Sequence, residues 1–257
     1  MKMGFVVALS LAVALLTGAA PLHAKPSAAN GASPTSVAAL PAPPSGTWHF
    51  KIYFGDYTTG IEVASLDYII RVDGGHYRLA TEGRASGLVA LFYSGVLTQT
   101  SEGRLTAAGL EPEHYSEKRG KRPERSLRVD RQSGQVIFKR KPARKLVPGT
   151  QDRLSVLVQL GLLARAQPGR FAPNAVISLP ELSIGDLQIA SYTVRGVQNL
   201  PTPRGPLRAL HLERPAPQKD GANRIEAWLG YDQQLLPVRI RITEPDGRVF
   251  DQMLALD

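Results

Sequence analysis

Cysteine is absent from the 257 residues of the chain. This absence excludes disulfide bonds, a nucleophilic thiol and a thiolate metal site. We expect no lipid anchor either, because that modification needs a cysteine at the site where a leader is cleaved. A chain of this length buries enough apolar surface to fold without cross-links. We therefore expect a fold that is held together by core packing.

A hydrophobic run long enough to span a bilayer, about 20 residues, is also missing. The apolar run from Met3 to Leu16 is shorter, with one lysine ahead of it and small residues and Pro21 behind it. This order is typical of a cleavable secretory signal. We predict that residues 1–24 are a signal peptide removed after Ala24, and that the mature protein is soluble and periplasmic.

The residues behind the predicted signal, 25–46, are rich in Ala, Pro, Ser and Gly and include no aromatic side chain. Such a composition is typical of a flexible linker. The remaining residues, 47–257, have a length within the range of one large β domain. The sequence thus predicts a single folded domain behind a linker.

Acidic residues are scarce between Lys118 and Lys145. This segment holds twelve basic residues and two acidic ones, a net charge of +10, whereas the whole chain has a net charge of +9. A solvated hairpin explains such a segment without any function. A cluster of cations would also attract lipid phosphates or other anionic envelope components, and export argues against nucleic acid as the partner. The predicted anion contacts are Arg119, Lys121, Arg122 and Arg125.

Alternation of apolar and polar side chains dominates the chain from Thr47 onward. In residues 47–54, every second side chain from Trp48 is aromatic or aliphatic, as in a strand with one buried face. Short turns separate the strands, which favours antiparallel pairing. In the last hairpin, we expect Arg239 and Arg241 on a solvated face. The further predicted strands are 61–72, 76–85, 95–104, 113–118, 126–130, 136–140, 175–179, 187–198, 207–214, 224–229 and 237–243.

One segment, residues 150–166, has helical spacing instead. Leu154, Val158 and Leu162 recur at intervals of four, and Thr150 or Asp152 can cap the helix start. The middle of this helix is almost wholly apolar, so it must lie against a large apolar surface. The predicted fold is mostly β: a single large curved antiparallel sheet or half-open barrel, with this helix on its concave side.

A second apolar segment, SGLVALFYSG at residues 86–95, fits either a short helix or an inserted loop. Plain core packing is the commoner role for such side chains. If the sheet is half-open, however, this segment and the helix together line a pocket for an acyl chain. The predicted lining residues are Leu88, Leu91, Phe92, Leu157 and Leu160.

Sequence motifs for known chemistry are few. We find no GxSxG elbow, no phosphate-binding loop and no dinucleotide fingerprint, so we predict no cofactor. His211 and Glu213 share one strand face and form a two-residue fragment of a metal site, but a solvated strand face is the simpler interpretation. Asp152 fits a helix start better than a catalytic carboxylate. We therefore assign no catalytic residue and no metal ligand.

Four stretches of the sequence resemble, in order, landmarks of the exported envelope proteins that are grouped as domain-of-unknown-function family 3108. The resemblance extends from Trp48 to the C terminus and implies an exported β-rich domain, with a bent antiparallel sheet wrapped around a helix. That shape is similar to the lipoprotein carriers of the LolA and LolB type. The family supplies no catalytic residue to carry over. The stretches are ALFYSGVLTQTSEG, GLEPEHYSEKRGKRPER, QDRLSVLVQLGLL and WLGYDQQLLPVRIRI.

These observations predict a non-enzymatic periplasmic protein that binds or chaperones a hydrophobic or amphiphilic envelope component, such as a lipid or lipoprotein, with peripheral contact to the membrane. Two alternatives remain: a protein-interaction module without a ligand cavity, and a hydrolase of cell-wall or carbohydrate material. A carrier requires an apolar cavity beside the helix. A module requires a filled core and an exposed apolar patch, and a hydrolase requires polar groups that converge in a cleft.

Overall fold

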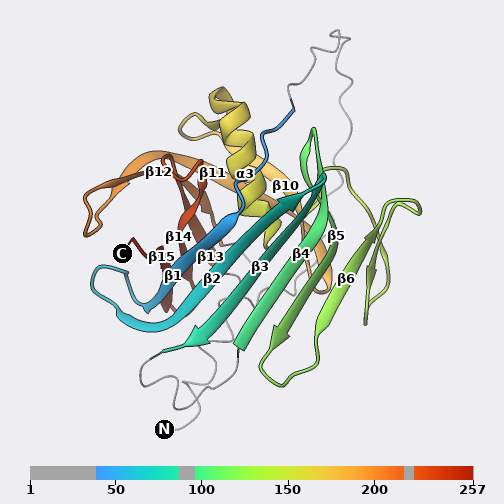
Figure 1. Ribbon diagram of the computed structural model, residues 1–257, viewed down its shortest axis with the longest axis horizontal. Coiled ribbons are helices and arrows are strands. Elements are labelled where there is room, and N and C mark those ends of the chain that lie inside the picture. The colour runs from blue at the N-terminus through green and yellow to red at the C-terminus, as the bar shows by residue number, and fades with distance from the viewer. Residues whose placement is uncertain (1–38, 87–95, 217–222, 257) are drawn as a thin grey trace.

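The computed structural model describes residues 39–86, 96–216 and 223–256. The predicted signal peptide, most of the predicted linker, and Leu88, Leu91 and Phe92 lie outside these residues. Within the described residues the chain forms fifteen β-strands, one α-helix and one 3-10 helix. All fifteen strands belong to one curled sheet (Figure 1), so the prediction of a mostly β protein with one large sheet is confirmed.

The first eight strands form one half of the sheet and the other seven form the second half. The first half consists of β1 Gly46–Phe54, β2 Ile61–Asp73, β3 His76–Ala85, β4 Val96–Thr106, β5 Gly109–Arg119, β6 Arg125–Asp130, β7 Gln135–Phe138 and β8 Arg144–Lys145. The second half consists of β9 Gln151–Asp152, β10 Val176–Ser183, β11 Asp186–Leu200, β12 Leu207–Arg214, β13 Arg224–Gly230, β14 Leu236–Thr243 and β15 Val249–Leu254, with the helices α3 Ser155–Ala166 and η1 Pro168–Phe171 between β9 and β10.

The strand order is a meander that starts from the middle. It runs β8-β7-β6-β5-β4-β3-β2-β1-β15-β14-β13-β12-β11-β10-β9, so the first and last strands of the chain are neighbours. Neighbouring strands pair antiparallel, as the short turns predict, except that β9 pairs parallel with β10. The edge strands β8 and β9 are not paired with each other, and the sheet is therefore open. Residues 146–150 carry the chain from one edge to the other.

The core lies on the sheet face that is turned toward α3. One cluster joins Tyr115 of the first half, Val238 of the second half and Val158 of the helix. A second cluster joins Leu160 of the helix with Leu212 of β12. Side chains of α3 therefore contribute to both clusters, and the helix contacts β5, β9 and β14. One helix thus packs against strands from both halves of the sheet.

The helix begins later than the sequence predicts. Residues 151–152 form the short strand β9, and α3 starts at Ser155 rather than at Thr150. The start is nevertheless capped by Asp152, whose Oδ1 accepts the backbone N–H groups of Leu154 and Ser155, each at 2.9 Å. Pairing with β10 holds residues 151–152 in an extended conformation, and the helix can form only beyond them.

The end of the predicted linker contacts the domain. Leu40 is buried in the main core cluster, and its backbone N–H donates to the carbonyl oxygen of Ala107 at 2.9 Å. Ser45 Oγ accepts the backbone N–H of Val72 at 2.9 Å. The chain is therefore attached to the sheet before β1 begins.

Gly161 allows α3 to approach the β13–β14 turn closely. A Cβ atom at this position would lie far inside the van der Waals distance of the Leu235 carbonyl oxygen. We expect Gly161→Ala to lower the free energy of unfolding by about 1–3 kcal/mol, because the helix or the turn must shift. Urea unfolding followed by circular dichroism measures the change.

Gly169→Ala is the matched control for this prediction. Gly169 lies in η1, close to α3, and a Cβ atom there would meet no atom within 4 Å. We expect this variant to stay within about 0.5 kcal/mol of the wild type. Equal stability of the two variants would show that the close approach at Gly161 is unimportant.

Candidate anion-binding site

Glu117 lies at the centre of a buried polar network on β5. Its side chain is fully buried, and Tyr115 Oη donates to Glu117 Oε1 at 2.8 Å. Gln99 Nε2 in turn donates to Tyr115 Oη at 2.7 Å. Gln99 and Glu117 are direct partners across β4 and β5. Glu117 and Tyr115 are two residues apart on one strand, so both side chains lie on the sheet face that carries the core.

Three guanidinium groups converge on the Glu117 carboxylate. Arg125 Nη2 lies 2.9 Å from Oε2, Arg119 Nη2 lies 3.8 Å from Oε2, and Arg153 Nη1 lies 3.9 Å from Oε1. The Arg125 side chain is 54% exposed, whereas those of Arg119 and Arg153 are 14% and 18% exposed. β5, β6 and the connection between β9 and α3 thus contribute one cation each. We call Arg119, Arg125 and Arg153 the arginine cluster.

The arginine cluster and Glu117 together carry a net positive charge, because three guanidinium groups surround one carboxylate. Burial lowers the pKa of Arg119, Glu117 opposes this effect, and the neighbouring charges of Arg125 and Arg153 lower the pKa further. Repulsion between the guanidinium groups is therefore part of the electrostatics of the site. An additional anion would reduce this repulsion, and guanidinium groups bind carboxylates and phosphates in a planar, two-pronged geometry.

Apolar side chains border the arginine cluster. Leu97 of β4 is the direct partner of Arg119 and is buried. The same row continues through Gly83, whose position is close to Leu66 of β2. Leu66 packs on a small cluster formed by Ile52, Val63 and Ala64. Cationic and apolar surfaces thus adjoin on one face of the sheet.

Only part of the predicted anion-contacting group meets at this site. Arg119 and Arg125 belong to the arginine cluster. Lys121 and Arg122 are exposed in the connection between β5 and β6, and among the described residues neither side chain has an ion-pair partner. The interpretation as a fully solvated hairpin is therefore wrong for Arg119, because the buried Glu117 attracts it.

Two of the predicted lining residues, Leu157 and Leu160, lie in the described part of the chain, and they do not meet the arginine cluster. Leu160 is fully buried and Leu157 is partly buried, and both belong to the cluster that contains Leu212 of β12. That cluster is distinct from the row of Leu97 and Leu66. Their role in ligand binding stays a prediction.

Sequence reasoning missed Glu117 and Arg153. Glu117 is two residues from both Tyr115 and Arg119, and this spacing places a carboxylate beside an arginine on the core-facing side of a strand. Arg153 directly follows the helix-capping Asp152, but the sequence offers no sign that it lies near β5. The long-range contact is created when α3 packs on the sheet.

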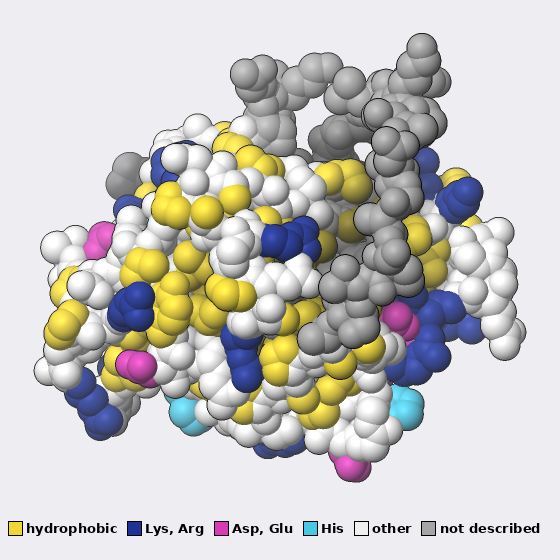
Figure 2. Space-filling view, turned by 90° about the horizontal axis from the view of Figure 1, so that it is seen from above, with side chains coloured by type: hydrophobic (Ala, Val, Ile, Leu, Met, Phe, Trp, Pro, Cys, Tyr) yellow, Lys and Arg dark blue, Asp and Glu magenta, His cyan; other side chains and the backbone are white. Residues whose placement is uncertain are grey.

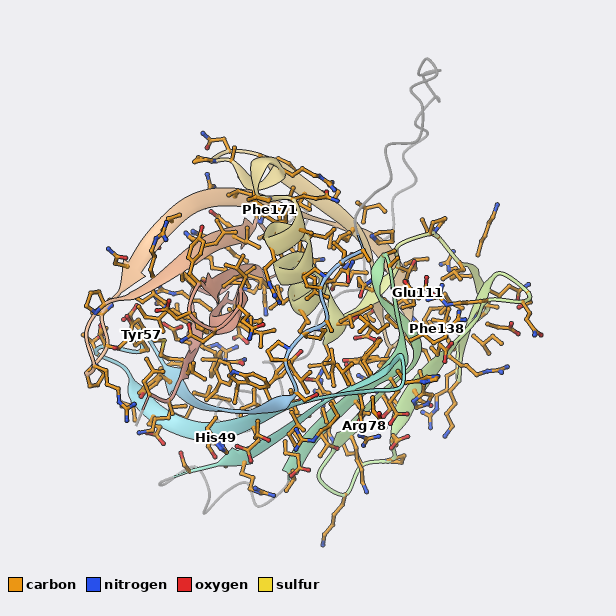
Figure 3. The ribbon with its side chains drawn as sticks, turned by 45° about the horizontal axis from the view of Figure 1, so that its top comes forward. His49, Tyr57, Arg78, Glu111, Phe138 and Phe171 are labelled. Atoms are coloured by element: carbon orange, nitrogen blue, oxygen red, sulfur yellow. The ribbon has the colours of Figure 1, made fainter. Side chains whose placement is uncertain are left out.

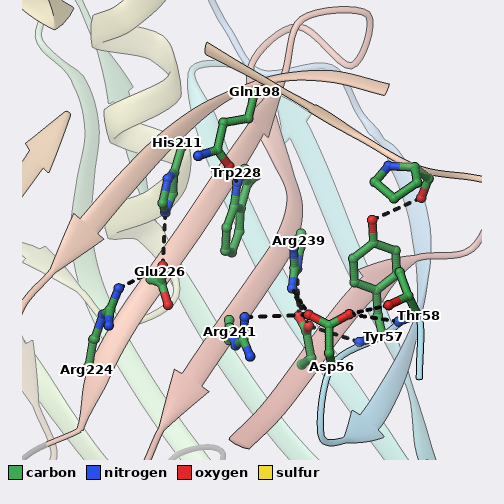
Figure 4. A network of polar contacts seen from close by, with 12 residues as sticks. Asp56, Tyr57, Thr58, Gln198, His211, Arg224, Glu226, Trp228, Arg239 and Arg241 are labelled. Carbon is green, nitrogen blue, oxygen red and sulfur yellow. Dashed lines mark hydrogen bonds and ion pairs between the residues drawn. The ribbon is translucent and has the colours of Figure 1, made fainter. Parts of the chain in front are cut away.

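A second polar network covers β12, β13 and β14 (Figure 4). His211, Trp228 and Arg239 are successive partners across these strands. The rings of His211 and Trp228 stack with their centroids 4.3 Å apart. The guanidinium carbon of Arg239 lies 4.3 Å from the Trp228 ring and 4.4 Å from the Tyr57 ring. Four planar groups therefore form one stack.

The position of Arg239 corrects the prediction of a solvated face in the last hairpin. Arg239 is buried, because the β1–β2 connection brings Tyr57 and Asp56 over it. Its Nε and Nη2 atoms donate to the two carboxylate oxygens of Asp251 at 2.9 and 2.6 Å. Figure 3 shows Tyr57 at the opposite side of the molecule from Phe138 of β7. This network is thus separate from the basic segment.

His211 and Glu213 are buried rather than solvated. His211 Nε2 lies 3.2 Å from Glu226 Oε1, and Glu213 pairs with Arg195 and Arg224 at 2.6 and 2.9 Å. The bond to His211 is the main cause that lowers the pKa of Glu226, and Arg224 lowers it as well. Glu213 is thus part of an ion-pair lattice on the sheet, in which Arg195 and Arg224 supply the counter-charges that a buried carboxylate requires.

Asp152 is a buried acid whose carboxylate caps the start of α3. Burial raises its pKa to about 6, although hydrogen bonds from Ser101 and from the Ser155 and Leu154 backbone act in the opposite direction. Ser101 Oγ donates to Asp152 Oδ2 at 2.5 Å. The carboxyl group is fully buried, so it lacks the access to substrate that a catalytic acid needs.

Residues 39–86, 96–216 and 223–256 contain no group of three or more His, Asp or Glu side chains that could hold a metal ion. No helix in the same residues is long and apolar enough to cross a membrane.

The fold and the cluster together define a mostly β protein with one open meander sheet and an arginine cluster on its helix-facing side. The family model described as "Protein of unknown function (DUF3108)" matches residues 49–254. The chain belongs to this family, which confirms the resemblance inferred from the sequence. No curated protein matches its sequence significantly.

The comparison with solved structures gives a match with a TM-score above 0.5 and further matches below it. A β-barrel-like protein of the domain of unknown function DUF1849 from Brucella abortus has a TM-score of 0.53 and 13% identity, over 84% of this chain and 98% of that one. A predicted lipoprotein from Parabacteroides distasonis has a TM-score of 0.34 and 8% identity, over 84% and 97% of the two chains. The likeness to the Brucella abortus protein shows a shared fold alone.

Proposed function

We propose that this protein binds an amphiphilic component of the bacterial envelope, with the anionic group of the ligand on the arginine cluster. One observation carries the proposal: Arg119, Arg125 and Arg153 converge on one buried carboxylate, directly beside Leu97. The site offers a charged contact and an apolar contact on the same sheet face. A molecule with a charged head and an apolar tail matches both.

The head of the ligand is an anion that guanidinium groups can chelate. Glu117 supplies one negative charge, whereas the arginine cluster supplies three positive ones. A phosphate or carboxylate that approaches Arg125, the most exposed of the three, gains charge-assisted hydrogen bonds. The partly buried position strengthens this attraction relative to bulk water.

The tail of the ligand packs against Leu66, which is partly exposed and lies in the same row as the buried Leu97. This row leads from Arg119 to the cluster of Ile52, Val63 and Ala64. In this proposal α3 lies on the concave side of the curled sheet, and Arg153, in the connection between β9 and α3, lies beside Glu117. A non-enzymatic binding protein needs no other chemistry at the site.

The envelope location rests on the predicted signal peptide and on the exported character that the family resemblance implies. Residues 1–24 have the charged, apolar and small-residue order of a secretory signal. An exported protein encounters lipids and other amphiphiles with phosphate groups. The proposed ligand class is therefore present in the compartment.

Native mass spectrometry of the mature protein, purified from the periplasm without detergent, tests the proposal directly. We expect a stoichiometric lipid or other anionic amphiphile to copurify. Titration with octyl phosphate, followed by calorimetry, then tests the site. We expect Arg119→Gln or Arg153→Gln to weaken octyl phosphate binding by about ten- to a hundredfold, the usual effect of losing a hydrogen bond to a charged group.

Lys118→Gln is the matched control for these variants. Lys118 is adjacent to Arg119 on the same strand, is exposed and points to the opposite face. We expect octyl phosphate to bind this variant as it binds the wild type, and neutral octyl glucoside to bind all variants weakly. Equal losses in Lys118→Gln and Arg119→Gln would contradict the proposed site.

A wild type that carries no amphiphile and does not bind octyl phosphate would overturn the proposal. The protein-interaction alternative would then gain weight. One observation already favours it: Val176 of β10 and Ile189 of β11 are 60% and 62% exposed. Such side chains are common at contacts between proteins.

A further inference from the structure

Two basic turns remain outside the arginine cluster. The connection between β5 and β6 contains Lys121 and Arg122, and the connection between β7 and β8 contains Lys139 and Arg140. All four side chains are exposed. Among the described residues none of the four has an ion-pair partner. The positive charge of these turns is therefore available to a partner.

The meander places both turns at the same end of the sheet. Antiparallel neighbours alternate in direction, so the turn between β6 and β7 lies at the opposite end and the next turn returns to the first. Arg119, the last residue of β5, leads directly into the first turn. Figure 2 shows a group of Lys and Arg side chains toward the right of the view, with other Lys and Arg side chains spread over the rest of that face. The arginine cluster adjoins this basic end.

Protection of an edge strand explains only some of these cations. Arg144 and Lys145 form β8, which is an edge of the sheet, and charged side chains on edges prevent pairing with other chains. The four turn residues lie outside the strands and have no such role. Residues 139–145 hold five basic and no acidic side chains. This density favours a partner with many negative charges.

We infer that this end of the sheet docks on an anionic lipid bilayer, through Lys121, Arg122, Lys139 and Arg140. A bilayer surface presents many phosphates in one plane, and two neighbouring turns can contact it at the same time. Docking in this orientation directs the arginine cluster toward the membrane, from which an amphiphile would be taken. The inference goes beyond the proposed ligand site and does not depend on it.

Sedimentation with vesicles tests the docking surface. The wild type is mixed with vesicles of phosphatidylcholine alone or of phosphatidylcholine with phosphatidylglycerol. We expect partition to the vesicles that contain phosphatidylglycerol and a loss of partition as salt is raised. Each removed cation lowers the partition coefficient by about fivefold, so Lys121→Gln/Arg122→Gln and Lys139→Gln/Arg140→Gln are each expected to lose about 25-fold.

A double variant with the same change of charge elsewhere is the control. Arg170 and Arg204 are exposed in η1 and in the connection between β11 and β12. Arg170→Gln/Arg204→Gln is expected to retain the partition of the wild type within about twofold. An equal loss in this variant would show a general charge effect and overturn the inference. Equal partition of the wild type to vesicles with and without phosphatidylglycerol would also overturn the inference.

Titration with octyl phosphate separates this inference from the proposed function. We expect Lys139→Gln/Arg140→Gln to bind octyl phosphate as the wild type does, because neither residue belongs to the arginine cluster. Loss of vesicle binding with intact octyl phosphate binding supports docking through the turns. Vesicle binding that persists in this variant, but is lost in Arg119→Gln, would overturn docking and leave the ligand site standing.

Discussion

Replacing Arg239 with methionine is expected to lower the free energy of unfolding by about 3–5 kcal/mol, the usual effect of breaking one side of a buried ion pair. Asp251 is fully buried and accepts two hydrogen bonds from Arg239, at 2.9 and 2.6 Å. Without the guanidinium group, the Asp251 carboxylate has lost its closest counter-charge in the protein interior. Urea unfolding of the two proteins at neutral pH measures the difference.

Three further contacts enlarge the expected effect. Burial alone would lower the pKa of Arg239, but the bonds to Asp251 and the charge of Asp56 outweigh it and raise the pKa. The guanidinium group also lies between the rings of Trp228 and Tyr57, and such contacts contribute about 0.5–2 kcal/mol each. Methionine retains only the apolar part of these contacts.

Arg241→Met controls for the loss of a positive charge on the same strand. The Arg241 side chain is 29% exposed and lies 3.5 Å from Asp56 in its ion pair. We expect a loss of about 1 kcal/mol or less. In a double variant, Asp251→Leu should recover part of the stability that Arg239→Met loses, because no buried charge is then left without its partner. A large loss in Arg241→Met would contradict this account.

Asp152→Asn is expected to change the pH dependence of stability. The asparagine Oδ1 can still accept the backbone N–H groups of Leu154 and Ser155 that Asp152 caps. The variant has no charge to desolvate, whereas burial raises the pKa of Asp152 to about 6. The free energies of unfolding of the wild type and of Asp152→Asn should therefore differ most at neutral pH.

The sign follows from proton binding. Because the folded-state pKa of Asp152 lies above its ordinary value of 3.8, the folded protein binds more protons than the unfolded chain between about pH 4 and pH 6. Stability from this group is therefore present below pH 4 and is lost as the pH rises through 6. Relative to the wild type, Asp152→Asn should gain on the order of 3 kcal/mol between pH 4 and pH 7.

Asp130→Asn is a control with the opposite sign. Asp130 Oδ1 accepts the backbone N–H groups of Gln132 and Ser133, much as Asp152 does in the core. Asp130 is only partly buried, however, and the hydrogen bonds with Ser133 lower its pKa. Its stabilising effect should be lost only as the pH falls below the ordinary Asp value of 3.8, so urea unfolding of both variants from about pH 2 to pH 8 tests the contrast. Parallel curves would refute the account of Asp152.

The strands could be predicted closely because apolar and polar side chains alternate within each strand according to which face is buried. Residues 76–85 and 207–214 form β3 and β12 with the predicted bounds, and β2 extends the predicted segment 61–72 by one residue. Alternation of side chains and short turns are local signals. Tertiary contacts were needed only at places such as Gln151–Asp152, where pairing with β10 replaces the first helical turn.

The candidate site could be predicted only in part. The excess of arginine and lysine in residues 118–145 is visible in the sequence, and it identified Arg119 and Arg125. Arg153 joins them from a separate region of the chain, across the contact of α3 with β5. A residue's charge is local information, but the burial of Glu117 that attracts these cations depends on the packing of the sheet.

The sequence by itself determined that the chain is mostly β, that its strands pair as an antiparallel meander, and that one basic segment holds the excess charge. These properties depend on side-chain alternation and on charge, both of which are set by residues that are close in the sequence. Only the tertiary structure decided that Arg239 is buried and which cations surround Glu117. Both outcomes depend on which surfaces cover one another, because a charge is stable in the interior only where packing brings a counter-charge beside it.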